Sequence, residues 1–152
     1  MKKQTIFLLT VFALNFKLQI FVMQSGVETC FSQATRIWST YYGKTSDEQG
    51  WSVASDASGN VYLAGTTQSA TGIAAGGFQN TFGGGINDAF LVKLDAAGNR
   101  LWATYYGGIG NEYAYSVAAD PSGNVYLAGT TQSTTGITSG GFQNTYGGGS
   151  ND

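Results

Sequence analysis

The sequence predicts an all-β protein built from short strands and tight turns, and three observations support that fold class. Glycine occurs 23 times among the 152 residues, proline occurs once and histidine is absent, a composition that favours strands and turns over helices. A sequence unit recurs with a period of 64 residues. Within each unit, short apolar runs alternate with turn sequences of the form Asp-x-x-Gly-Asn, which is typical of antiparallel hairpins.

The repeat covers nearly everything after residue 36. Residues 37–88 superpose on residues 101–152 with 36 of 52 positions identical, and the block 58–69 recurs unchanged as 122–133. A fixed period in this range is typical of solenoids, propellers and arrays. The fold is therefore best predicted from the repeated unit.

Each unit is predicted to contain four short strands joined by hairpins. The strands are expected at 89–95, 100–106, 113–119 and 124–131, the last three recurring at 36–42, 50–55 and 60–67. In the turns at 56–60, 95–99 and 120–124, the aspartate can bond the turn backbone and the glycine can close a type I turn with a bulge. We expect positive φ at Gly59 and Gly123.

The strands are apolar on both faces, which predicts a more specific architecture. Val125 and Leu127 alternate with Tyr126 and Ala128, whereas a sheet with one wet face would alternate apolar with polar residues. Stacked blades require sheets covered on both sides. We predict a β-propeller fragment of four-stranded antiparallel blades, with about two blades present; a parallel β-solenoid is the alternative, but its shorter rungs need no such hairpins.

The segment 68–88 separates the last strand of one unit from the first strand of the next. It is rich in glycine, serine and threonine and is long for a blade connection. Phe78 is one of its few large apolar residues. We expect Phe78 to hold this segment against the sheet.

Residues 1–34 differ from the rest and are predicted to be a signal peptide. Lys2 and Lys3 precede an apolar run at 5–14, and Ser32 and Ala34 offer small residues at the positions a signal peptidase reads. A membrane anchor over 6–23 is the alternative, but Lys17 interrupts it at a cost of about 2.5–3.5 kcal/mol. A lipoprotein site at Cys30 is disfavoured by the residues before it. Cleavage after Ala34 leaves a mature chain without cysteine.

The acidic residues mostly obey the repeat. Their paired positions are Asp56 with Asp120, Glu48 with Glu112, and Asp88 with Asp152. An active site built once per protein should not recur in every blade, so turn or blade-junction roles are favoured over acid or base catalysis. We predict no catalytic residue.

Other chemistry is also disfavoured. The Asp-x-x-Gly-Asn segments resemble the start of a calcium loop, but the liganding carboxylates are too few and a strand follows at once. The glycine runs 83–85 and 147–149 precede no lysine or helix start, as phosphate binding would need. Beyond Ala34, four basic residues face eight acids, which disfavours nucleic-acid binding. We predict no metal, no cofactor and no nucleic-acid partner.

The aromatic residues could stack on sugar rings, although burial between blades explains most of them. Position 51, tryptophan in one copy and tyrosine in the other, is the least constrained. The aromatic positions are Trp38, Tyr41, Tyr42, Trp51 and Tyr62, with their counterparts Trp102, Tyr105, Tyr106, Tyr115 and Tyr126.

Four motifs of the repeat together resemble the bacterial seven-bladed β-propeller repeat family, often abbreviated SBBP. They are Trp-x-Thr-Tyr-Tyr-Gly, Ser-Val-Ala-x-Asp-x-Ser-Gly-Asn-Val-Tyr-Leu-Ala-Gly-Thr-Thr, Gly-Phe-Gln-Asn-Thr and Asn-Asp-Ala-Phe-Leu-Val-Lys-Leu. The resemblance covers about residues 36–152. It implies an exported protein, often with many repeats and sometimes a C-terminal sorting domain, and it brings no catalytic residues. Because the chain stops at Asp152, where the next Ala-Phe-Leu-Val-Lys-Leu is due, we expect a truncated member.

Two functions are compatible with these observations. The first is a secreted or cell-surface structural or interaction module, which binds further blades and an unknown protein or glycan partner without a stable membrane anchor. The second is part of a propeller-type polysaccharide hydrolase or lyase. The absence of histidine and the repetition of the acids favour the non-enzymatic module.

Export generates the first testable prediction. If residues 1–34 are a signal peptide, the exported chain begins at Thr35. N-terminal sequencing of the secreted protein checks this, and retention of Met1 would contradict it.

Overall fold

The computed structural model describes residues 10–15 and 35–152, and these residues form strands and no helix, as the all-β prediction requires. No helix that could span a membrane was found in this part of the chain. The predicted strands appear within two residues of their expected ends. The predicted ones are β2 (Thr35–Tyr41), β3 (Glu48–Ser55), β4 (Val61–Thr67), β5 (Asp88–Leu94), β6 (Arg100–Tyr106), β7 (Glu112–Ala119) and β8 (Val125–Thr131), and β1 (Thr10–Asn15) is a further strand that was not predicted.

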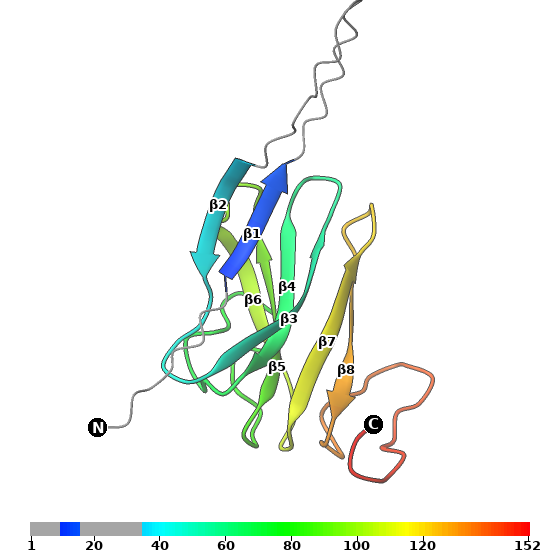
Figure 1. The fold of residues 1–152 in the computed structure, drawn as a ribbon. Coiled ribbons are helices and arrows are strands. Elements are labelled where there is room, and N and C mark those ends of the chain that lie inside the picture. Colours follow the sequence, from blue (N-terminus) through cyan, green and yellow to red (C-terminus); the bar gives the residue numbers. More distant parts are fainter. Residues whose placement is uncertain (1–9, 16–34) are drawn as a thin grey trace, which may run out of the picture.

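The strands form one complete blade with partial sheets beside it. The order β3-β4-β5-β6 makes a four-stranded antiparallel meander, while β1-β2 and β7-β8 form separate pairs (Figure 1). This corrects the predicted grouping of 89–131 into one sheet. Strands β6 and β7 are not paired, so the break between sheets falls at residues 107–111, and the long segment 68–87 joins two strands of one sheet.

The first strand lies within the segment predicted as a signal peptide. It pairs antiparallel with β2, from Thr10 opposite Tyr41 to Asn15 opposite Thr35. Residues 1–9 and 16–34, including Cys30 and the expected cleavage site, lie outside the described residues. Export and cleavage therefore stay predictions.

The hairpin turns have the predicted geometry. In the first, the Gly59 amide donates to the Asp56 carbonyl at 3.0 Å and the Asp56 amide donates to the Asn60 carbonyl at 3.1 Å. The φ angles of Gly59 and Gly123 are 79° and 84°. The prediction of left-handed glycines in these turns is confirmed.

The central strands of the blade are buried on both faces. One face forms a core cluster that includes Leu63, Phe90 and Val92, against which Trp38 of β2 packs. The opposite face, which includes Tyr62 and Leu91, packs against the β7-β8 hairpin in a second cluster. The two-sided apolar pattern of the sequence is thus explained by neighbours on both sides.

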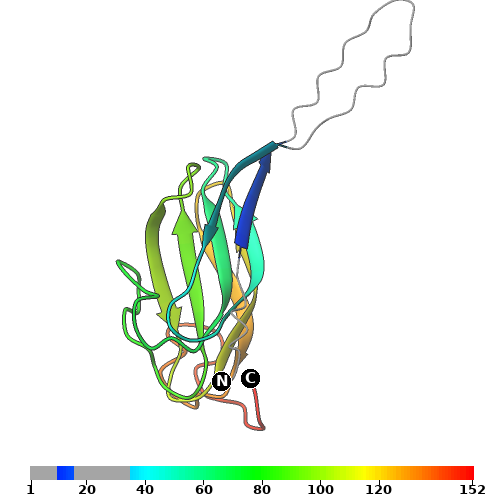
Figure 2. The same cartoon turned by 60° about the vertical axis from the view of Figure 1, so that its left-hand side comes forward.

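The segment 68–87 covers one edge of the blade and part of one face. It runs beside β6 (Figure 2), where the backbones of Ala75 and Ala103 exchange two hydrogen bonds of 2.9 Å. The residue that anchors it is Ile73, which is 1% exposed, whereas Phe78 is 86% exposed. The prediction that Phe78 holds this segment against the sheet was wrong. The segment pairs with the edge of β6, and this pairing places Phe78 outside the core.

Two strands of identical sequence have different surroundings. Strands β4 and β8 both read Val-Tyr-Leu-Ala-Gly-Thr-Thr. Tyr62 of β4 is fully buried, while its counterpart Tyr126 in β8 is 59% exposed. Strand β4 has β3 and β5 as neighbours, whereas β8 has only β7 along most of its length.

The turn geometry gives a stability prediction. Replacing Gly123 by valine should destabilise the protein by about 1 kcal/mol or more, because a β-branched residue is strained at positive φ. The site isolates this backbone effect, since a Cβ at residue 123 would meet nothing within 4 Å. Chemical denaturation measures the change.

Gly141→Val is the matched control. A Cβ there also meets nothing within 4 Å, but φ lies outside the left-handed region. Equal stability of the Gly123→Val variant and the control would show that the turn does not depend on the glycine.

Candidate functional site

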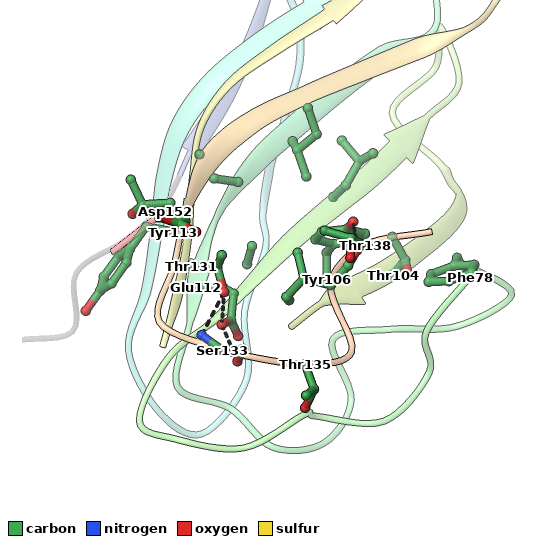
Figure 3. A pocket seen from close by; sticks show the side chains of 18 of the residues that line it. Phe78, Thr104, Tyr106, Glu112, Tyr113, Thr131, Ser133, Thr135, Thr138 and Asp152 are labelled. Atoms are coloured by element: carbon green, nitrogen blue, oxygen red, sulfur yellow. Dashed lines mark hydrogen bonds between the residues drawn. The ribbon is translucent and has the colours of Figure 1, made fainter. Parts of the chain in front are cut away.

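A large hollow in the described structure lies between the blade and the β7-β8 hairpin. It has a volume of about 1090 Å³ and is lined by both apolar and hydroxyl side chains. Leu91, Trp102 and Tyr106 line it from the blade, and the segment after β8 lines it from the other side (Figure 3). It is the first candidate for a binding site.

The hollow coincides with an uncovered part of the blade face. The β7-β8 hairpin covers the face over Tyr62 and Ala64. The edge of β8 away from β7 makes a backbone pair only at its end, where Thr131 and Asp152 exchange bonds of 2.8 and 3.0 Å. In the first copy, the equivalent residues Thr67 and Asp88 are also opposite each other. There the chain continues after Asp88 as β5, which pairs with β4 along its whole length. We interpret the hollow as a blade-packing surface.

A glutamate at the polar end of the hollow holds the sheet ends together. Glu112 is 2% exposed. Its Oε1 accepts hydrogen bonds from Thr131 Oγ1 at 2.7 Å and Ser133 Oγ at 2.6 Å (Figure 3), and its Oε2 accepts one from the Gly108 amide at 3.0 Å. These contacts favour a structural role over proton transfer.

The same arrangement occurs in the first copy. Glu48 accepts from Thr67 Oγ1 at 2.8 Å and from the Lys44 amide at 2.9 Å. In both copies, a glutamate at the start of one strand thus links the end of the neighbouring strand to the chain segment just before the glutamate. The repetition supports the junction role inferred from the sequence.

The turn aspartates are occupied by their own hairpins. Asp56 Oδ1 accepts from the Ser58 and Asn60 amides at 2.9 and 3.0 Å. Its Oδ2 accepts from Asn60 Nδ2 at 2.8 Å and from the Tyr62 hydroxyl at 3.0 Å. The Asn60 side chain, with these other donors, lowers the pKa of Asp56 to about 2.

The other two turns repeat this pattern. The Asn99 side chain lowers the pKa of Asp95, and the Asn124 side chain lowers the pKa of Asp120. Hydrogen bonds from the turn thus favour the ionised form of these carboxylates. The hairpin interpretation accounts for all three.

Asp88 differs from the turn aspartates because it is fully buried. The Gly83 amide donates to its Oδ2 at 2.6 Å, so the first glycine run binds a carboxylate of the chain itself. Burial raises the pKa of Asp88 to about 6; the nearby Glu112 carboxylate adds to the rise, while the Gly83 and Gly84 amides oppose it. Sequence reasoning placed Asp88 at a blade junction but missed its burial; its position directly before an apolar strand was the available signal.

The aromatic residues divide into buried and exposed groups. Tyr62 and Tyr105 are core residues, whereas Trp51 and Tyr115 are 51% and 49% exposed. These two rings meet edge to face at a centroid distance of 6.0 Å. Each sits at a register irregularity of its strand, between Gly50 and Ser52 in β3 and between Ala114 and Ser116 in β7. Repeated bulges therefore bring position 51 and its counterpart together on the surface.

No group of three or more histidine, cysteine, aspartate or glutamate side chains lies close enough to hold a metal in residues 10–15 and 35–152.

Comparison with protein-family models finds one family, the SBBP β-propeller repeat, which matches residues 101–138. The match spans β6, β7, β8 and the start of the following segment. No curated protein matches the chain.

Proposed function

Because the chain carries an SBBP β-propeller repeat, we propose that it is a non-catalytic structural and interaction module of the cell exterior. Its blade faces dock against further blades, and the assembled surface binds a protein or glycan partner. Export by residues 1–34 is part of the proposal. Removal of that segment would also remove β1 and free the edge of β2.

One observation carries the proposal. The strand sequence that is buried in β4 is exposed in β8, as the exposures of Tyr62 and Tyr126 show. An apolar face next to an open strand edge is a surface suited to another protein surface. In the first copy, the equivalent edge, that of β4, is paired with the β5-β6 hairpin, which extends the sheet. A hairpin of the same kind is therefore the expected partner of β8.

The acids of the described residues give the hydrolase or lyase alternative little support. Glycosidases need two carboxyl groups that reach the substrate. The turn aspartates are bound within their hairpins, and Glu48, Asp88 and Glu112 are buried. This leaves Asp47 and Asp152 as the exposed acids of the described residues. The exposed pair Trp51 and Tyr115 offers a stacking surface for a glycan instead.

Extension of the chain tests the docking function. A second copy of residues 89–106 added after Asp152 should pair with β8 and fill the hollow. We expect a higher melting temperature and less self-association in size-exclusion chromatography, because the added hairpin covers the exposed face. The same extension with aspartate at the copies of Phe90 and Val92, which face the core in β5, is the control.

Two results would contradict the proposal. In the first, the extended protein has the same melting temperature and the same degree of self-association as the control extension. The second is release of reducing ends from a polysaccharide panel by the extended protein, which is the outcome that the hydrolase alternative predicts.

A further inference from the structure

A buried carboxylate at the blade junction has one oxygen without a partner. Asp88 is 0% exposed. Its Oδ2 accepts from the Gly83 amide, but its Oδ1 has no hydrogen-bond partner among the described residues. Buried ionised groups are normally paired or coordinate a metal. The free Oδ1 therefore points to a ligand.

A second carboxylate oxygen reaches the same point. A Cβ placed on Gly107 would lie 2.8 Å from Asp88 Oδ1 and 2.7 Å from Glu112 Oε2. The Oε2 atom takes one hydrogen bond, from the Gly108 amide. Two carboxylates from different strands thus converge on the α-carbon of Gly107, and any side chain there would displace them.

Within residues 10–15 and 35–152, neither Asp88 nor Glu112 forms an ion pair with a lysine or arginine. The ion pair found among the described residues is Lys93 with Asp56, in a hairpin turn. Like charges at short range in a buried site repel, and a cation between them removes the repulsion.

We propose that Asp88 and Glu112 bind a hard metal cation, for which Ca²⁺ is the probe, at the junction of two consecutive blades. Hard cations prefer carboxylate and carbonyl oxygens. The Gly107 and Gly108 carbonyl oxygens lie close to Gly83, at 2.6 and 2.4 Å from a Cβ placed there. Such carbonyls and water complete the coordination, since the described residues offer no third acidic side chain at this point.

The site is formed by residues of two successive repeats. Gly43 and Glu48 occupy the positions of Gly107 and Glu112 in the first copy, and Asp152 occupies that of Asp88 in the second. Like Asp88, Asp152 accepts a hydrogen bond from a glycine amide, that of Gly147. Asp152 is exposed, so the two aspartates differ in burial.

Calcium titration of the 152-residue chain tests the proposal. Calorimetry at pH 7.5 should show saturable binding of Ca²⁺, and Ca²⁺ should raise the melting temperature while a chelator lowers it. Asp88→Asn and Glu112→Gln should each weaken the affinity at least tenfold. Asp152→Asn, the matched control, should bind within twofold of the parent.

Far-UV circular dichroism establishes that each variant is folded, and the titration of the parent stands without any variant. The proposal is overturned if the parent shows no saturable Ca²⁺ binding and no thermal shift at pH 7.5. It is also overturned if Asp152→Asn weakens binding as much as Asp88→Asn. Stability that rises as the pH falls through 6, with no response to Ca²⁺, would show that the two carboxylates share a proton instead.

Discussion

Burial of the β4-β5 pair on both faces is the constraint on which the rest of the structure depends. All but two residues of these strands are buried, which requires covering material on each side. The segment 68–87 and β2 supply one cover, and the β7-β8 hairpin supplies the other. A sheet with two apolar faces needs a cover on each side, and the proposed docking of further blades would extend the packing that β2 and the β7-β8 hairpin already provide.

The polar residues of the repeat serve the same purpose. The Asp-x-x-Gly-Asn turns close the hairpins with hydrogen bonds from their own backbone, which fixes the register of each apolar face. The glutamates that begin β3 and β7 tie strand ends to the junction segments. Asp88 is the exception, because part of its bonding capacity is unused. That unused oxygen is the reason why the cation site is proposed at Asp88, with Glu112 as its second carboxylate.

The sequence predicted the features that depend on local chemistry. Strand positions follow from short apolar runs, and the positive φ of Gly59 and Gly123 follows from a turn that few other residues can adopt. Pairing across the chain is not local, and there the prediction failed. The segment 107–111 joins two sheets and the longer 68–87 joins strands of one sheet, because the blade begins at Glu48 rather than at Ala89.

The candidate site was harder to predict for the same reason. Repetition indicated that Asp88 and Glu112 have junction roles, but their convergence on Gly107 depends on how successive sheets pack. Likewise Ile73 and Phe78 lie in one glycine-rich segment, and only the pairing with β6 determines which of them is buried.

The most direct test of this account is amide hydrogen exchange, measured by NMR, in the two identical strands Val61–Thr67 and Val125–Thr131. Their intrinsic exchange rates are the same because their sequences are the same, so any difference reports the surroundings. The account predicts strong protection along the whole of β4 and weaker protection in β8, apart from Thr131, which pairs with Asp152. Equal protection of the two strands would contradict it.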